Sequence, residues 1–217
     1  MARRRLTAAE RRQEILRAAL DVFAASGYHG ASIDEVARTA GVSKALVFQH
    51  FASKRELHDT LLDEHATELF RRFRANAEKG TTGEERLRGG VDAFFSFVEE
   101  HADAWRALFR DQADPELRPV IDRLQEQAVN VMDALALQDP GTPRRRPDES
   151  EEEYLVALEM LSRLLSGSVQ GLANWWLEHP EVPRSALVDR VVDFCWVGLE
   201  RLRDGERATP GGVRGDA

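Results

Sequence analysis

The sequence contains little cysteine and no long apolar segment. Only one of its 217 residues is a cysteine, Cys195, so an intramolecular disulfide and a cysteine-rich zinc site are both excluded. No run of 18 apolar residues occurs, and the N-terminus lacks the apolar segment of a signal peptide. We therefore expect a cytoplasmic protein that has no membrane partner.

The sequence also lacks the alternating pattern of β-strands and any recognisable catalytic arrangement. Its apolar residues recur at helical spacing, which predicts an all-α fold of about nine helices. It offers no nucleophile–base pair, metal-ligand cluster or phosphate-cradling loop. His58 and His65 lack metal-ligand spacing, and such histidines are more often surface residues. We expect no catalytic site, no metal site and no cofactor.

Charge is distributed unevenly along the sequence. The chain carries a formal net charge of −8. Residues 1–57 hold ten Lys and Arg against six Asp and Glu, a net charge of +4, which leaves −12 for the remainder. A basic N-terminal quarter on an acidic body is typical of a protein that contacts DNA at one end only.

Residues 32–51 predict two short helices joined by a tight turn. Ser32 and Ser43 are N-cap residues, and Ser32 with Glu35 has the pattern of a capping box. Gly41 suits the left-handed backbone that ends the first helix. This arrangement is a helix-turn-helix, which presents its second helix to the major groove. An ordinary αα-hairpin has the same spacing, so the surrounding residues must decide between the two.

Those surrounding residues resemble the signature of the tetracycline-repressor (TetR) family. The matching positions, which follow one another in order, are Arg12, Ile15, Leu16, Ala18, Ala19, Phe23, Gly27, Tyr28, Ser32, Ile33, Val36, Ala37, Ala40, Gly41, Val42, Ser43, Lys44, Phe48, His50, Phe51, Lys54 and Leu57. Residues 80–205 resemble the family only in the number of helices and in a closing pair of long helices. The resemblance implies a homodimeric transcriptional regulator, usually a repressor, that a small molecule releases from a palindromic operator.

The resemblance also implies a division into domains. Residues 1–57 are the predicted helix-turn-helix DNA-binding domain, residues 58–205 the predicted helical ligand-binding and dimerisation domain, and residues 206–217 a disordered tail. Residues 139–149 are rich in proline and charge, which predicts a mobile loop. The segment Arg3–Arg5 is either a minor-groove arm or a solvated tail.

The expected DNA contacts lie in and around the second helix of the motif. Lys44 and Ala45 are expected to meet base edges, and Gln49 is one turn further along. The residues expected at phosphates are Ser32, Ser43, Phe48, His50 and Lys54. For the two serines the alternative role is N-capping alone, and for His50 it is a structural role near a helix end.

Two positions depart from the family pattern. Ala45 stands where glycine is frequent, and its small side chain still permits close approach to the groove. Phe48 stands where tyrosine is frequent, so one phosphate hydrogen bond, worth on the order of 1 kcal/mol, is lost. Neither change removes the expectation of DNA binding.

The last two long helices predict a subunit interface. Residues 154–177 are apolar nearly all round, so a helix here must be covered on more than one side. Together with the resemblance, this predicts a four-helix interface between two subunits. The predicted interface residues are Leu164, Gly167, Gly171, Leu172, Val191 and Phe194. The alternative is a single large monomer core.

A small, largely apolar effector is the other predicted partner. Aromatic, Met and Asn side chains of the middle helices are candidates for its site: Phe94, Phe97, Trp105, Phe109, Met132, Met160, Asn174 and Trp175. Any of them is more often plain core. Two other functions stay open, a DNA-binding protein without an effector and, with the least support, a helical enzyme.

Overall fold

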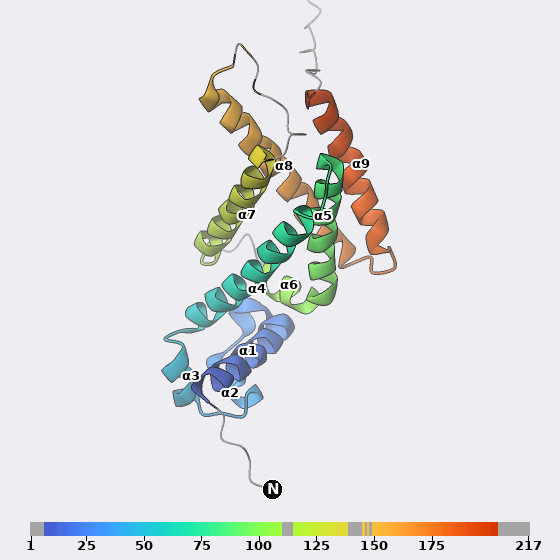
Figure 1. The fold of residues 1–217 in the computed structure, drawn as a ribbon. Coiled ribbons are helices and arrows are strands. Elements are labelled where there is room, and N and C mark those ends of the chain that lie inside the picture. Colours follow the sequence, from blue (N-terminus) through green and yellow to red (C-terminus); the bar gives the residue numbers. More distant parts are fainter. Residues whose placement is uncertain (1–6, 110–114, 139–144, 146, 148, 204–217) are drawn as a thin grey trace, which may run out of the picture. The chain divides into compact units, whose positions relative to one another are not determined.

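The computed structural model describes residues 7–109, 115–138, 145, 147 and 149–203 (Figure 1). Within these residues the protein is entirely helical, as the sequence predicts, with α1 Ala8–Gly30, α2 Ile33–Thr39, α3 Lys44–His50, α4 Lys54–Ala77, α5 Gly83–Glu100, α6 Ala102–Phe109, α7 Arg118–Gln138, α8 Glu151–Trp176 and α9 Arg184–Arg203. None of the described helices has the length and apolar character needed to cross a membrane. The predictions for residues 1–6, for most of the loop 139–149 and for the tail 206–217 lie outside the described residues.

The chain forms two compact units. The first, here called the head unit, contains residues 1–72 and 96–128, and the second, the body unit, contains residues 73–95 and 129–217. Three helices, α4, α5 and α7, contribute residues to both units. The compact units therefore do not coincide with the expected boundary after residue 57.

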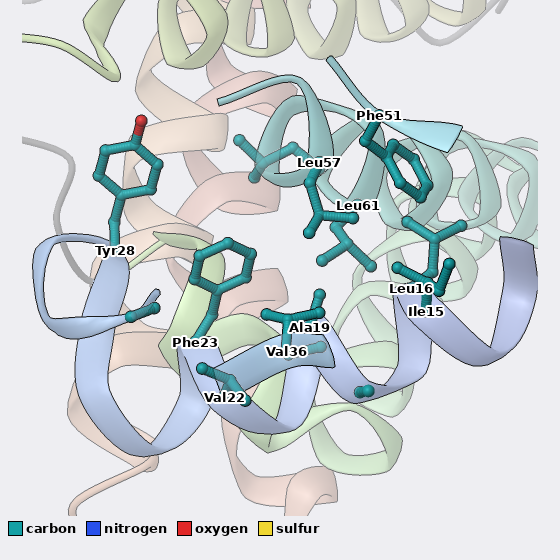
Figure 2. Close-up of a cluster of buried hydrophobic side chains, with 14 of the residues drawn as sticks. Ile15, Leu16, Ala19, Val22, Phe23, Tyr28, Val36, Phe51, Leu57 and Leu61 are labelled. Atoms are coloured by element: carbon teal, nitrogen blue, oxygen red, sulfur yellow. The ribbon is translucent and has the colours of Figure 1, made fainter. Parts of the chain in front are cut away.

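The head unit is built around one face of α1. A capping box between Thr7 and Glu10 begins this helix, as the sequence predicts, and Gly27 interrupts it with a φ of 69°. Side chains of α1, α2, α3 and α4 meet in one core, in which Phe23, Phe51 and Leu57 are fully buried (Figure 2). Helix α6 packs against α1 in the same unit.

His58 corrects one expectation from the sequence. We expected a surface histidine, but its side chain is 0 % exposed in the head unit. Its ring lies edge-on to Phe23, at a centroid distance of 5.1 Å, and to Tyr28, at 4.9 Å. The imidazole therefore serves as a small aromatic packing group. No group of three or more His, Cys, Asp or Glu side chains in the described part of the chain is placed to hold a metal ion.

The body unit is held together by close helix packing and by two ion pairs. A side chain at Gly90 would collide with the Phe73 ring, 2.7 Å from the ideal Cβ position, so this glycine lets α5 approach the end of α4. Arg88 pairs with Asp189, and Arg184 with Asp92, so α5 is joined to α9 at two points.

Candidate nucleic-acid interface

The turn between α2 and α3 has the predicted geometry. Gly41 adopts a φ of 65° and ends α2, and a Cβ there would meet no atom within 4 Å, so backbone conformation alone favours glycine. The amide of Val42 donates to the carbonyl of Ala37 across the turn, at 2.9 Å. Ser43 then caps α3 by accepting from the amide of Leu46, at 3.2 Å. The two helices are therefore fixed by local bonds.

Helix α3 divides into a buried side and an exposed side. Val47 is 0 % exposed and anchors the helix in the head core. Lys44, Ala45, Phe48 and Gln49 are exposed, and Phe48 is 45 % exposed although it is a large apolar residue. The residues expected to reach the major groove thus share the solvent side of a helix whose other side is held firmly in place.

The predicted phosphate contacts from the serines and His50 are in accessible places. Ser32 and Ser43 are exposed, and His50 is half-buried. Both serines are also N-caps, so the capping role is present whatever they do on DNA. The capping box predicted for Ser32 forms only in part, because Glu35 uses its carboxylate to accept from Arg38, at 3.4 Å.

Lys44 already has an acidic partner inside the protein. Its ammonium donates to the Oδ2 atom of Asp34 on α2, at 2.8 Å, and both side chains are more than half exposed. An exposed ion pair of this kind contributes only about 0–1 kcal/mol. Lys44 can therefore exchange Asp34 for a base or phosphate at small cost. Sequence reasoning missed this pair, because ten residues and a turn separate its members.

Loss of the Asp34 charge should strengthen DNA binding. We expect Asp34→Asn to tighten operator binding about two- to five-fold, because Lys44 is released and one acidic group near the phosphates is removed. Fluorescence anisotropy with labelled operator measures the change. Asp193→Asn, the same substitution at an exposed position of α9, is the matched control and should leave affinity unchanged. Weaker binding by the Asp34 variant would contradict the proposed position of Lys44 at the DNA.

Lys54 has a structural role that the sequence did not reveal. Its Nζ atom donates to the carbonyl oxygens of Tyr28, at 2.8 Å, and Ala31, at 3.2 Å. The same ammonium lies 4.5 Å from the centroid of the Tyr28 ring. These contacts bind the first residue of α4 to the last turn of α1, which follows the kink at Gly27, and to Ala31 directly after it. Because they span more than twenty residues, no local sequence pattern predicts them.

The candidate effector residues are distributed over both units. Phe97 and Trp105 are buried in the head unit, and Phe94 is buried in the body unit. Met132 is half-buried. The side chain of Phe109 lies outside the described residues.

Three further candidates lie on the exposed side of α8. Met160, Asn174 and Trp175 are exposed, and the Trp175 ring stacks on His179 at a centroid distance of 4.2 Å. An exposed side chain does not line an enclosed cavity. The expectation that these three residues lie inside one therefore has no support from their positions.

A groove of about 580 Å³ opens in the body unit between the end of α7 and the beginning of α8. None of the seven candidate effector residues whose side chains are described lines it. Its lining combines apolar side chains with four carboxylates, namely Leu137, Leu155, Val156 and Leu158 with Asp133, Glu151, Glu152 and Glu159. The described part of its lining therefore carries negative charge.

The predicted interface residues of α8 and α9 differ in accessibility. Leu164 is 68 % and Phe194 77 % exposed, and Gly167 and Gly171 have open space around the position of a Cβ. Leu172 is half-buried. Val191 is 5 % exposed inside its own unit, so it is not available to a partner. Its spacing alone did not distinguish it from Phe194, three residues further along.

Two family models match most of the chain. Residues 15–61 match the model described as bacterial regulatory proteins, tetR family, and residues 84–198 match that of the tetracyclin repressor-like C-terminal domain. The first match covers α2, α3 and the turn between them. The second covers most of the segment from α5 to α9, where sequence resemblance was weak.

Individual proteins resemble the chain over most of its length. The transcriptional activator FasR of Mycolicibacterium smegmatis is 30 % identical over 201 residues, which cover 91 % of this chain and 87 % of FasR. The transcriptional repressor KstR2 of Mycobacterium tuberculosis is 32 % identical over 130 residues, 58 % of this chain and 64 % of KstR2. The crystal structure of FadR from Bacillus subtilis with stearoyl-CoA has the same fold, with a TM-score of 0.66, 18 % identity and coverage of 90 % of this chain and 99 % of FadR.

Proposed function

This chain belongs to the TetR family of bacterial transcriptional regulators, and we propose that it is a cytoplasmic homodimer that binds a palindromic operator through α3 and leaves it when an effector binds. The observation that carries the proposal is the division of α3. Val47 fixes the helix in the core, while Lys44, Ala45 and Gln49 lie on its solvent side with the side chains needed to contact bases.

Homodimerisation is supported by the exposed apolar residues of α8 and α9. The exposed positions Met160, Leu164, Gly167, Gly171 and Trp175 follow one another at intervals of four, three, four and four residues, which places them on one side of α8. Helix α9 adds Phe194 and Val197, both more than half exposed. Large apolar side chains exposed along a helix mark a contact with another protein surface. A second copy of the chain supplies a matching surface by symmetry.

We propose a long-chain acyl group, such as that of a fatty acyl-CoA, as the effector. The support is the likeness to FadR, whose structure contains stearoyl-CoA. The described lining of the groove in the body unit holds four carboxylates, which disfavour the phosphates of the anionic CoA moiety there. The proposal therefore favours a binding place other than this groove.

A regulator of this family can either repress or activate transcription. We propose repression, which the 32 % identity to the repressor KstR2 over 58 % of this chain supports. Activation is the alternative, and the 30 % identity to the activator FasR over most of both chains favours it. A reporter gene behind the selected operator distinguishes the two, since removal of the regulator raises expression in the first case and lowers it in the second.

One experiment tests both DNA and effector binding. We expect selection from random duplex DNA to enrich a palindrome, and stearoyl-CoA to release the protein from it in an anisotropy assay. Free CoA, which lacks the acyl chain, is the matched control and should cause no release. If no sequence is enriched, operator binding is refuted. If the palindrome is enriched but no acyl-CoA of any chain length releases it, only the effector class is refuted.

A further inference from the structure

A chain of polar contacts reaches the helix-turn-helix from the beginning of α7. The Tyr28 hydroxyl donates to the Oε1 atom of Glu116, at 2.8 Å, although 88 residues separate the two. The backbone carbonyl of Tyr28 and that of Ala31 both accept from Lys54. Residues 27–31, here called the connector, are thus held from two distant places in the head unit.

Most of Tyr28 is part of the head core. The residue is 2 % exposed, and its ring stacks with Phe23 and meets His58 edge-on. Figure 2 shows its hydroxyl directed away from the Phe23 ring. Burial and the adjacent Glu116 carboxylate raise the pKa of the Tyr28 phenol to about 12. The phenol therefore keeps its proton and remains a hydrogen-bond donor throughout the physiological range.

The connector determines where α2 begins. Gly27, with its φ of 69°, ends the regular part of α1, and Ser32, the N-cap of α2, directly follows Ala31. A rotation of the connector would therefore carry Ser32 and α2 with it. Since the turn at Gly41 fixes α3 to α2 by local bonds, α3 would move as well.

Glu116 lies just before α7, a helix that contributes residues to both units. It lies two residues before the start of α7, and the buried residues Leu117, Val120 and Ile121 anchor that end of the helix in the head core. The last part of α7, from Val129 onward, belongs to the body unit. A single helix thus begins beside the connector contact and continues into the unit that contains α8 and α9.

We propose that Glu116 and Tyr28 are positioning residues for operator binding. Their hydrogen bond sets the orientation of the connector and hence of α2 and α3, and a displacement of α7 changes operator affinity by straining or breaking it. This inference rests on the proposed operator binding. Neither side chain is required to touch DNA.

Removal of the Tyr28 hydroxyl is the most direct test. We expect Tyr28→Phe to weaken operator binding five- to twenty-fold, about 1–2 kcal/mol, because the ring packing stays and only the bond to Glu116 is lost. The slope of affinity against salt concentration should not change, since no phosphate contact is removed. Tyr154→Phe, which changes the chain's other tyrosine, is the matched control and should bind as the wild type does.

Substitutions at Glu116 complete the test. Glu116→Gln keeps an oxygen acceptor and should stay within two-fold of wild-type affinity, whereas Glu116→Leu should match Tyr28→Phe. In a double-mutant cycle, Glu116→Leu should have no further effect once the hydroxyl is gone. If Glu116→Leu does not fold, Tyr28→Phe and Glu116→Gln still decide the matter.

Two results would overturn the inference. The first is wild-type affinity in Tyr28→Phe, with or without a lower unfolding temperature, because the bond would then only stabilise the fold. The second is additive losses in the double-mutant cycle. If the wild-type protein itself binds no operator, the proposed function fails first, and the two failures are thereby distinguished.

Discussion

Replacement of Lys54 by methionine should lower the free energy of unfolding by about 2–4 kcal/mol. The ammonium donates two charge-assisted hydrogen bonds, to the carbonyls of Tyr28 and Ala31. Because the Lys54 side chain is only half-buried, each bond contributes about 1–1.5 kcal/mol, at or below the lower end of the range for bonds to charged groups. Its cation–π contact with the Tyr28 ring adds about 0.5–1 kcal/mol. Methionine keeps most of the apolar stem, so the loss reports on the charged end.

The measurement for Lys54 is urea unfolding followed by circular dichroism. Lys79→Met is the matched control, because Lys79 is exposed and its ammonium donates to the nearby Asn76 side chain, so its effect should stay within about 0.5 kcal/mol. An unfolding free energy for Lys54→Met that equals that of the wild type would show that the three contacts contribute nothing to stability.

Operator affinity separates the two roles of Lys54. Two of its three N–H donors are used on carbonyls, and the third is left to reach a phosphate, as the sequence resemblance implies. If it does, Lys54→Met removes one phosphate contact. The slope of log affinity against log salt concentration should then become less steep by about one. If the salt dependence is unchanged while stability falls, Lys54 is a structural residue only.

The helix-turn-helix could be predicted because the forces that form it are local. The cap residues Ser32 and Ser43 and the left-handed Gly41 act within four residues of themselves, and the structure confirms all three. The division of α3 follows from the same register, since Val47 points inward while Lys44, Ala45, Phe48 and Gln49 remain exposed. For this motif the sequence pattern therefore predicts the helix ends, the turn and the buried side of α3.

The contacts that hold this motif in place could not be predicted. Lys54 reaches back 26 residues, and Tyr28 reaches forward 88 residues to Glu116. Neither contact corresponds to a periodic pattern in the sequence, because each contact forms only once the helices have taken their positions in the fold. The same reason explains His58, whose seven-residue distance from His65 gave no sign that aromatic rings enclose it.

The closing helices show a second limit of sequence reasoning. Because α8 is apolar nearly all round, its sequence predicts two covered sides without saying which residues belong to which. The structure places Leu158, Val169 and Ala173 inside the body unit and leaves Leu164 exposed. In α9 the same choice separates buried Val191 from exposed Phe194. Which of these apolar residues are buried can be assigned only when the positions of the neighbouring helices are known.

A charge at Leu164 should convert the proposed dimer into a monomer. We expect Leu164→Glu to sediment as a single chain at micromolar concentration, because a carboxylate at a 68 % exposed leucine would be buried without a partner when two subunits meet. Operator affinity should fall at least 100-fold, about 3 kcal/mol, because a monomer can read only one half-site. Its helical content should be unchanged, since the side chain makes no part of the monomer core.

Leu155→Glu is the matched control for this prediction. Leu155 is also an exposed leucine of α8, but it lies nine residues earlier, about two and a half turns, and therefore on the opposite side of the helix. It lines the acidic groove of the body unit. The control variant should remain a dimer with wild-type operator affinity. A dimeric Leu164→Glu protein would refute the proposed α8 interface, and dissociation of both variants would place the contact on a wider surface than the one argued from Met160, Leu164, Gly167 and Gly171.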